Sequence, residues 1–490
     1  MKKNLLLFSR CDLVHLYGRL DKYLSKDFNI IHLAYSKKEE EILKNDYYIN
    51  NIINFKNETF QIYVKEKLNV ELCNIIDSLI IEQTQNRFCL NSAIQSDRTF
   101  QYLEYNDCLL LCQIYYKFWN NIIMNYKIDF IIHEPTALYI TQIASILCNK
   151  YGGKYLAQIH GIGENKYDWF FVEGDIGIPF ELNYNLKHLN NIEIERVKAY
   201  IEEFRNESTV LFSEYIQKVN TKKNQPLIKF VIILFRIIIR HLITLFRLTK
   251  KIEDTVFNHI ELHSQKFKPS FYKEFRNKWN AYFRLKFDEF NPTLKYYYYP
   301  IHLEPEAVVL YWGDGLYKNQ VKLIENIAAQ IPPDHYLFVK DHPHAGLYRD
   351  FADYTKIKTI PNIKLIDPNI PGKEIIKSAI AVITINGTGG FEGILFNKHV
   401  FTFGNSFYNE CNRVTYIKNV KELRKNIYAQ LNKEFKDDNE LFMFINAYLK
   451  SLHPGFVNYF LNRSELLKID DENNAKLIAK NIINSLQLGQ

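Results

Sequence analysis

The sequence predicts an α/β protein in which two doubly wound domains are separated by a helical insertion and followed by a helical tail. Three observations carry this prediction. Short apolar runs alternate with helix-length stretches in both halves of the chain, a basic stretch of helical period interrupts the alternation, and no low-complexity tract separates the parts. Strands that alternate with helical segments of about 10–15 residues indicate parallel βαβ units.

The composition is that of a folded chain with more than one core. Of 490 residues, 47% are hydrophobic and 15% aromatic, against only 18 Gly and 14 Pro. Such a chain buries enough apolar surface to offset the ordering entropy, which excludes a disordered or collagen-like protein. At roughly 150 residues per domain, the length predicts several structural units.

The first half predicts a Rossmann-like domain over residues 1–190. Residues 4–8 and 28–34 are β-prone runs on either side of a helical stretch, and the runs at 128–133 and 155–159 repeat the pattern. The domain lacks a GxGxxG motif. The N-terminal apolar run is too short for a signal peptide, so we expect it to be a buried strand.

The second half predicts another doubly wound domain, over residues 295–425. The apolar runs that we expect to be its strands are 307–311, 336–340, 363–366, 379–385 and 400–403. Five strands separated by helical or turn segments are typical of this class. Residues 191–294 are expected to form the helical insertion, and residues 426–490 a helical tail that packs back across the domains.

Seven cysteines lie scattered along the chain without a CxxC pair or a Cys/His cluster. This pattern indicates reduced thiols in a cytosolic protein, and it argues against both a disulfide framework and a structural zinc site.

The most informative motif is a glycine-rich turn between a predicted strand and a predicted helix. Its residues are Asn386, Gly387, Thr388 and Gly389. Free N–H groups and the helix dipole at such a turn hold an anion, and glycine lets a phosphate approach closely. Glu392, near the first helical turn, is placed to accept hydrogen bonds from a ribose. The structural alternative is an ordinary strand-to-helix turn.

A second anion-suited turn follows the run 336–340. His342 precedes a proline, which ends the strand and keeps His342 extended, so its imidazole leaves the sheet at the same edge as the glycine-rich turn. With Lys340 and Arg349 nearby, a donor at His342 suits a nucleotide phosphate leaving group. The alternative is a solvated turn histidine.

A third candidate lies just before the second domain. Prolines at positions 300 and 305 bracket His302 and Glu304. A loop stiffened at both ends keeps polar groups in fixed positions, as a preorganised donor site requires. The alternative is an interdomain linker with incidental charges.

Three strings, YPIHLEPEA, VKDHPH and ITINGTGGFEGILFNKHVFTFGNSFY, resemble the capsule polysaccharide biosynthesis family, which includes capsular Kdo transferases. The HP turn is also similar to that of bacterial sialyltransferases, which use CMP-sugars. The resemblance covers residues 295–410 and, more weakly, residues 129–166. It implies a GT-B fold, which two Rossmann-like domains also predict, with a nucleotide-sugar donor as substrate in the second domain, no metal and no cofactor.

By motif, the resemblance implies that Lys340 and His342 contact the donor phosphate and that Glu392 lies by the ribose. It also implies that the turn from Asn386 to Thr388 forms the phosphate-binding helix start. Asp341 stands where the family often has glycine, and the turn lacks the usual serine pair of the Kdo enzymes. These departures leave the nucleotide class open.

The candidates for acid, base or nucleophile are Glu134, His160 and Asp314. Glu134 ends an apolar strand of the first domain, where a carboxylate facing the cleft would remove the acceptor proton or attack the anomeric carbon. A carboxylate that caps the helix beginning near residue 136 is the structural alternative. His160 and Asp314 follow other predicted strands.

The basic charge of the chain is concentrated in one segment. Residues 216–251 contain nine basic residues and no acidic one, more than the net charge of +7. Four of them lie in a helical run at 227–248: Lys229, Arg236, Arg240 and Arg247. At about 100° per residue they fall within about 40° of one another on an otherwise apolar helix. This pattern is typical of a helix in the interface of an anionic membrane, and the alternative is a helix packed between the domains.

Nucleic-acid binding is disfavoured because this basic stripe is narrow. Together, the residues and the resemblance predict a glycosyltransferase at the inner face of the cytoplasmic membrane. The expected donor is a nucleotide sugar, in the first place a CMP-activated acidic sugar such as Kdo. The expected acceptor is a growing or lipid-linked bacterial surface polysaccharide of capsule or O-antigen type. Two alternatives remain: a nucleotide-sugar epimerase, and a non-catalytic partner in polysaccharide assembly or export.

Overall fold

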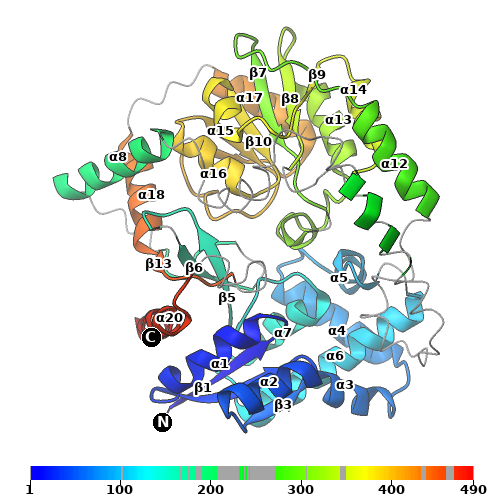
Figure 1. Ribbon diagram of the computed structural model, residues 1–490, viewed down its shortest axis with the longest axis vertical. Coiled ribbons are helices and arrows are strands. Elements are labelled where there is room, and N and C mark those ends of the chain that lie inside the picture. The colour runs from blue at the N-terminus through cyan, green and yellow to red at the C-terminus, as the bar shows by residue number, and fades with distance from the viewer. Residues whose placement is uncertain are drawn as a thin grey trace. The chain divides into compact units, whose positions relative to one another are not determined.

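The computed structural model forms two compact units. The first comprises residues 1–189 and 443–490, and the second residues 190–442. The residues that the structure describes are 2–100, 103–165, 167–174, 177–182, 189–206, 231–232, 234–236, 238–239, 242, 271–304, 306–342, 349–431, 438–458 and 468–488. Each unit has its own mostly parallel sheet with helices packed on it (Figure 1), which confirms the predicted α/β class with two Rossmann-like domains.

The first unit contains a seven-stranded sheet in the order β13-β6-β5-β4-β1-β2-β3. The strands are β1 (Lys3–Ser9), β2 (Phe28–Ala34), β3 (Ile52–Asn54), β4 (Phe130–His133), β5 (Lys154–Gly161), β6 (Asp168–Glu173) and β13 (His453–Pro454). Strands β1 to β5 run parallel, whereas β6 is antiparallel to β5 and β13 to β6. The strand order reverses between β1 and β4, the position where doubly wound sheets bind ligands.

Helices bury both faces of this sheet. They are α1 (Leu13–Leu24), α2 (Lys37–Tyr47), α3 (Phe55–Tyr63), α4 (Val70–Gln83), α5 (Leu90–Ser96), α6 (Tyr105–Tyr126), α7 (Tyr139–Lys150) and α20 (Asp471–Leu488). The apolar faces of α1 and α20 pack together over Leu5 and Leu7 of β1, and α20, red in Figure 1, lies beside α1. The tail helix α20 therefore completes the core of the first unit.

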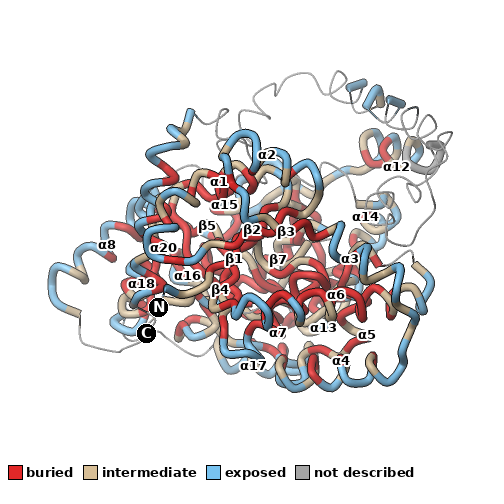
Figure 2. Tube along the Cα trace, turned by 90° about the horizontal axis from the view of Figure 1, so that it is seen from below, coloured by how far each residue is buried: buried red, intermediate tan, exposed pale blue. Residues whose placement is uncertain are grey.

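The second unit contains a six-stranded sheet in the order β12-β11-β10-β7-β8-β9. The strands are β7 (Tyr296–Pro300), β8 (Tyr336–Lys340), β9 (Ile363–Ile366), β10 (Ala381–Thr384), β11 (His399–Thr402) and β12 (Val414–Tyr416). All six run parallel, and the order reverses between β7 and β10. Parallel strands are buried on both faces, which explains why β8, β10 and β11 are continuous apolar runs. Figure 2 shows buried residues along the strands of both units.

One predicted strand of this sheet is wrong. Residues 307–311 were expected to be the first strand, but Val308–Trp312 is the π-helix η3. The first strand is instead β7, which the tyrosine run forms. Its four tyrosines are at most 2% exposed, and the Tyr296 hydroxyl donates to the Ile375 carbonyl at 2.6 Å. Both runs are rich in β-prone residues, so composition alone could not separate strand from helix.

The helices of the second unit are α8 (Asn191–Asn206), α12 (Phe271–Phe283), α13 (Gln320–Gln330), α14 (Phe351–Lys358), α15 (Gly372–Ser378), α16 (Thr388–Leu395) and α17 (Leu423–Leu431). Helix α18 (Asn439–Lys450) runs across the division at residues 442 and 443. The predicted insertion, 191–294, contributes α8 and α12 to this unit. Of the predicted tail, residues 443–490 belong to the first unit and residues 426–442 to the second.

Candidate functional site

The predicted donor residues gather at the carboxyl ends of three neighbouring strands of the second unit. His302 follows β7, the turn beginning at Asn386 follows β10, and Asp341 and His342 follow β8. The strand order reverses between β7 and β10, and ligands of doubly wound folds bind outside the carboxyl ends at this point. Loops far apart in the sequence therefore meet at one edge of the sheet.

The glycine-rich turn has the geometry of an anion site. Gly387 is the N-cap of α16 and has a φ of +96°, which glycine adopts far more readily than other residues. A Cβ at this position would lie 3.1 Å from His302 Cε1. The first N–H groups of α16, beginning with Thr388 and Gly389, have no intrahelical acceptor and lie at the positive end of the helix dipole.

Asn386 supports this turn from within. Its side-chain amide donates to the Asn405 carbonyl, and its Oδ1 accepts from the Gly387 N–H group. The hydroxyl of Tyr408 donates to the Gly387 carbonyl at 2.7 Å. With 3% exposure, Asn386 positions the turn. Tyr408 is a second support that sequence reasoning missed, because its partner is a backbone atom.

His302 is buried and neutral. Its Nε2 lies 3.1 Å from Thr384 Oγ1, and the Thr384 hydroxyl donates to the Asn386 carbonyl at 2.6 Å. The Asn386 N–H group lies 3.5 Å from the same Nε2 atom, so His302 contacts both the end of β10 and the glycine-rich turn. Burial, and then the charges of His342 and Arg349, lower the pKa of His302 to about 3. His302 therefore contributes shape and a hydrogen bond at neutral pH, but no positive charge.

Gln320, the first residue of α13, fixes the loop that carries His302. Its Oε1 accepts from the His302 N–H group at 2.8 Å, and its Nε2 donates to the His302 carbonyl at 3.0 Å and to Glu304 at 2.5 Å. A side-chain amide can satisfy the N–H and C=O groups of one residue at once. A single glutamine at a helix start carries no sequence signal, so this role could not be predicted.

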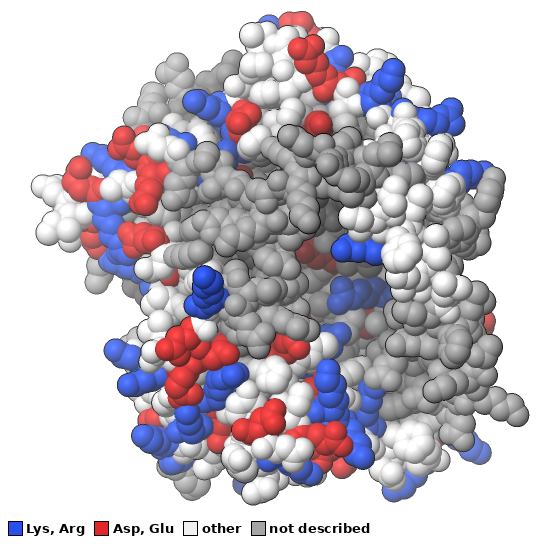
Figure 3. Space-filling model, viewed as in Figure 1, with Lys and Arg blue, Asp and Glu red and all other residues white. Residues whose placement is uncertain are grey.

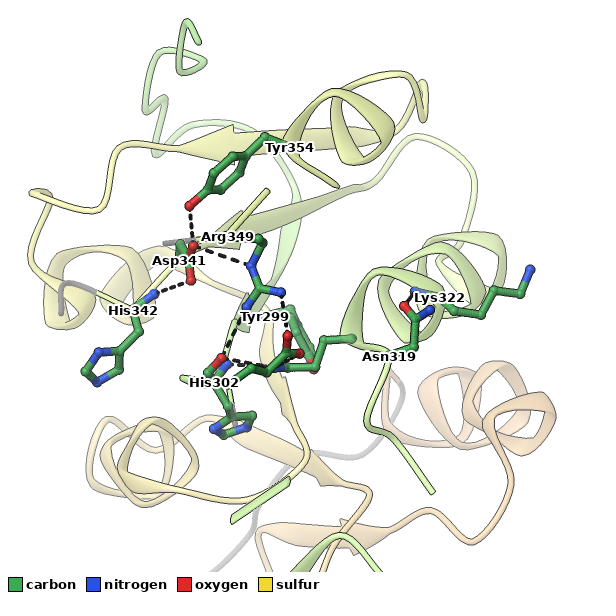
Figure 4. A network of polar contacts seen from close by, with 10 residues as sticks. Tyr299, His302, Asn319, Lys322, Asp341, His342, Arg349 and Tyr354 are labelled. Carbon is green, nitrogen blue, oxygen red and sulfur yellow. Dashed lines mark hydrogen bonds and ion pairs between the residues drawn. The ribbon is translucent and has the colours of Figure 1, made fainter. Parts of the chain in front are cut away.

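Arg349 connects two of the loops. Its guanidinium lies 3.0 Å from Glu304 and 3.5 Å from Asp341, and it donates to the His302 carbonyl at 3.3 Å. Asp341 also accepts from the Tyr354 hydroxyl at 2.5 Å. Figure 4 shows Arg349 between Asp341 and the His302 backbone. Because its side chain is 6% exposed and engaged by protein groups, Arg349 is placed to hold the loops together.

His342 lies next to this network. Its backbone N–H group donates to Asp341 Oδ1 at 2.8 Å, and its charge lowers the pKa of His302. The two imidazoles are therefore near each other at the carboxyl ends of β7 and β8. Pro343, on which the predicted extended conformation depends, lies outside the residues that the structure describes.

Glu392 is a buried carboxylate on α16. It is 8% exposed, and burial raises its pKa to about 7 against the opposing charges of Lys373 and Lys340. Among the residues that the structure describes, its carboxylate has no hydrogen-bond partner, so it is available to a hydroxyl group of a ligand. Lys340 is 5% exposed, and its Nζ lies 3.4 Å from the Pro368 carbonyl. The Lys340 ammonium group therefore already donates a hydrogen bond within the protein.

Asp314 does not follow a strand, so the reason for predicting it as a catalytic residue is removed. It lies after the π-helix η3 with a φ of +53°. Its Oδ1 accepts from Asn405 at 3.3 Å, and Asn405 in turn accepts from Asn386. Asp314 thus belongs to the outer support of the glycine-rich turn.

The first unit has a separate candidate site where its strand order reverses. Arg10 follows β1 and Glu134 follows β4, and the two side chains form an ion pair. His133 Nε2 lies 3.5 Å from the same carboxylate. Burial raises the pKa of Glu134, but Arg10 and His133 outweigh it and lower the pKa to about 2. A carboxylate of this kind stays ionised and is a weak base, which favours an electrostatic or nucleophilic role over the predicted base.

The capping alternative for Glu134 is wrong. Helix α7 begins at Tyr139, and the Tyr139 N–H group donates to Asp97 Oδ2 at 2.7 Å. Asp97 comes from the segment after α5, so the sequence near Glu134 gave no sign of it. His160 lies near the carboxyl end of β5, where burial lowers its pKa.

Comparisons with known proteins agree with the resemblance found in the sequence. A family described as "Capsule polysaccharide biosynthesis protein" matches residues 207–451, half of the chain. Protein FixF of Sinorhizobium fredii is 33% identical over 98 residues, which are 20% of this chain and 23% of FixF. The capsule polysaccharide export protein KpsS of Escherichia coli is 28% identical over 137 residues, 27% of this chain and 33% of KpsS.

The chain thus matches about a quarter to a third of the length of these curated relatives. Among solved structures, the β-Kdo 2,7 transferase KpsC of Thermosulfurimonas dismutans is 11% identical, with a TM-score of 0.36 over 96% of this chain and 99% of that chain. This structural likeness is weak, and the family match is the stronger finding. The chain belongs to the capsule polysaccharide biosynthesis protein family.

Proposed function

We propose that this protein is a GT-B-like glycosyltransferase that moves a sugar from a nucleotide-sugar donor to a growing or lipid-linked bacterial surface polysaccharide. The observation that carries the proposal is the meeting of three loops at the point where the strand order of the second unit reverses. An anion-suited helix start, a histidine and a buried carboxylate lie together there. These are the groups that a sugar nucleotide requires.

In the proposed reaction, the N–H groups at the start of α16 hold the donor phosphate. They stabilise the negative charge that develops on the leaving nucleotide as the glycosidic bond breaks. His342 adds a further donor when it is protonated, a role that neutral His302 cannot take. Glu392 accepts a hydrogen bond from the ribose. The nucleotide sugar is the substrate, and we propose no resident metal or cofactor.

The donor that we propose first is a CMP-activated acidic sugar such as Kdo, on the basis of the motifs shared with the capsule family. Thermal unfolding of the full chain with CMP, CDP, UDP or GDP tests the nucleotide, because a ligand that binds the native state raises its apparent stability. A shift with CMP alone supports this choice. A shift with UDP or GDP alone replaces it, and no shift with any of them contradicts a nucleotide site.

A binding-only role in polysaccharide assembly or export is the second candidate. The ion pair of Glu134 favours it, because a carboxylate with a pKa of about 2 serves poorly as a base. Incubation with donor and acceptor separates the functions. Release of free nucleotide supports the transferase, isomerised donor without acceptor supports an epimerase, and neither product supports the binding protein.

The first variant to test is His342→Ala. We expect donor affinity to fall about tenfold, because one charge-assisted hydrogen bond to phosphate is lost. Calorimetric titration with the nucleotide measures the effect, at one pH below and one pH above the usual pKa of histidine. His335→Ala is the matched control, since His335 precedes β8 at the opposite end of the strand. An unchanged affinity in His342→Ala would remove His342 from the phosphate site.

We also propose that the segment 227–248 attaches the protein to an anionic membrane surface. Of the predicted basic residues, Lys229, Arg240 and Arg247 lie outside the described residues, whereas Arg236 is helical and exposed. The same stretch exposes six apolar side chains by 41–63%: Val231, Ile232, Phe235, Ile238, Ile239 and Leu242. At about 100° per residue they share an arc of about 120°, the pattern of an interfacial helix. No helix among the described residues has the length and apolarity to cross a bilayer.

Flotation with liposomes tests this attachment. The protein should float with vesicles that contain anionic lipid at low salt, and much less with neutral vesicles. Replacing Phe235 and Leu242 by serine should abolish flotation, because it removes apolar side chains that enter the acyl boundary. As a control, Tyr48 and Val70 are similarly exposed apolar residues of the first unit, and their replacement should have no effect. Wild-type protein that stays unbound would refute the proposal.

A further inference from the structure

A polar cavity of about 600 Å³ lies in the second unit, away from the three loops described above. It is open to solvent on one side and is lined by the end of α8, the ends of α15 and α16, and the start of α18. Lys377 and Lys398 on its wall precede β10 and β11, so the cavity lies at the amino ends of these strands. Four-residue strands at about 3.3 Å per residue separate it by about 13 Å from the carboxyl ends. A nucleotide at the glycine-rich turn therefore leaves this cavity free.

The lining carries more positive than negative charge. The charged side chains on it are Lys198, Arg205, Lys377, Lys398, Glu202 and Asp438. Asp438 already pairs with the buried Arg413 at 2.6 Å, and Lys198 pairs with Glu195 of the same helix at 3.0 Å. Lys377 and Lys398 form no ion pair with any residue that the structure describes. Charged side chains of both signs gather over α8 in Figure 3. The uncompensated cations favour an anionic ligand.

Hydrogen bonds from side chains to backbone carbonyl groups hold the wall of the cavity in place. Arg205 Nε donates to the Leu395 carbonyl at 2.6 Å, which ties the end of α8 to the end of α16. Lys373 Nζ donates to the Phe204 carbonyl at 2.7 Å and lies 3.7 Å from the centre of its ring. Burial, and then the charge of Arg205, lower the pKa of Lys398. Two cations held this close together form a preorganised anion site.

The rest of the lining suits a sugar ring better than a bare phosphate. Phe396 and Phe442 are half-buried on the wall, and Asn206 and Asn397 add side-chain amides. Apolar surfaces accept the C–H face of a sugar, and the amides can bond its hydroxyl groups. The volume lies within the range of about 300–1,000 Å³ that is usual for small-molecule sites.

We propose that this cavity binds an acidic sugar unit of a glycan, at a distance from the donor site. That the ligand is a glycan rests on the proposed function. That this glycan is acidic follows from the charges that line the cavity. Binding there would hold a section of an acidic chain away from the donor.

Tetragalacturonate, an acidic oligosaccharide, is the probe, and its binding to the full-length protein is measured by calorimetric titration. We expect binding that weakens as the salt concentration rises. In the double variant Lys377→Ala/Lys398→Ala, affinity should fall about tenfold or more, because two charge-assisted contacts are lost. Lys377→Gln should weaken binding severalfold. Because Lys377 is exposed, this single variant replaces the double variant as the test if the double variant folds poorly. The matched control is Lys421→Ala/Lys425→Ala, which removes the same charge outside the cavity and should leave affinity unchanged.

Two further ligands test what the cavity recognises. Maltotetraose, a neutral oligosaccharide, should not bind, and inorganic phosphate should compete only at far higher concentration than tetragalacturonate. The proposal is overturned by unchanged affinity in the cavity variants, by equal binding of maltotetraose, or by phosphate that competes equally well. Nucleotide binding is measured with the same proteins and should be the same in all of them. If the wild-type protein binds no nucleotide, the proposed function is contradicted. The tetragalacturonate results decide separately whether the cavity binds an acidic glycan.

Discussion

Replacing Arg349 by methionine should destabilise the protein by about 3 kcal/mol or more, because removing one partner of a buried ion pair leaves the other charge uncompensated. Asp341, the partner left behind, is 1% exposed, and among the described residues the Tyr354 hydroxyl and the His342 N–H group remain as its donors. Methionine fills most of the arginine volume, so the loss is one of charge and hydrogen bonds. Denaturant unfolding of the two proteins measures the difference.

Two further variants show whether the charge is responsible. Adding Asp341→Asn to Arg349→Met should recover part of the lost stability, since the unpaired charge is gone, and the two changes should not be additive. Lys356→Met is the control: Lys356 belongs to the neighbouring α14, is 56% exposed, and lies 3.6 Å from Glu325. Exposed pairs of this kind contribute less than about 1 kcal/mol. A loss in Arg349→Met no larger than in this control would show that the loops are not held by Arg349.

The same variant connects stability with function. Arg349 also contacts Glu304 and the His302 carbonyl, so both the β7 and β8 loops lose a shared support. Nucleotide affinity, measured at a temperature where the variant is fully folded, should therefore fall as well. The expected pattern separates Arg349, which positions the site, from His342, whose loss should weaken binding without a matching loss of stability.

The sequence was sufficient to predict most of the fold, because buried parallel strands are continuous apolar runs. The strands β8, β9, β10 and β11 lie where such runs were found. The failure at residues 307–311 has a local reason: two valines beside aromatic residues are β-prone, yet this segment forms a π-helix. The tyrosine run was the real strand, and the hydroxyl groups of Tyr296 and Tyr299 bond to residues distant in sequence, Ile375 and Gln320.

Prediction of the site was limited in the same way. The glycine-rich turn could be placed because glycine and its position after a strand reveal a backbone requirement. The contacts made by Gln320, Tyr354 and Tyr408 join loops that are far apart in the chain, and no local pattern encodes them. The charge state of His302 could not be predicted either, because its neutrality follows from burial.

Glu134→Gln should reduce turnover about 10²-fold or more while leaving nucleotide binding near normal, since a carboxylate at the chemical step typically contributes about 10²–10⁴-fold. The glutamine keeps the size of the side chain and removes its charge. Initial rates of nucleotide release measure the effect. Glu173→Gln is the control, because Glu173 forms a surface pair with Lys154 at 3.5 Å in the same unit and should be dispensable.

The pH dependence of turnover distinguishes the roles open to Glu134. With a pKa of about 2, it is ionised throughout the neutral range, so its own titration should not appear in a rate profile between about pH 5 and pH 8. A fall in rate as the pH drops below about 7 belongs to another group, and Glu392, which accepts best from the ribose when ionised and has a pKa of about 7, is the candidate. Glu392→Gln should then remove that inflection, whereas a fall that persists in Glu392→Gln belongs to neither carboxylate.

The double variant Arg10→Gln/Glu134→Gln decides between chemistry and structure. In Glu134→Gln alone, Arg10 keeps its charge in a largely buried position without its partner, so a loss of activity could arise from local rearrangement. Two glutamines replace the ion pair with neutral groups that can hydrogen-bond to each other. If the carboxylate takes part in the reaction, the double variant stays as inactive as Glu134→Gln. If turnover returns, the pair is a structural element of the first unit, and Glu134 has no part in the chemistry.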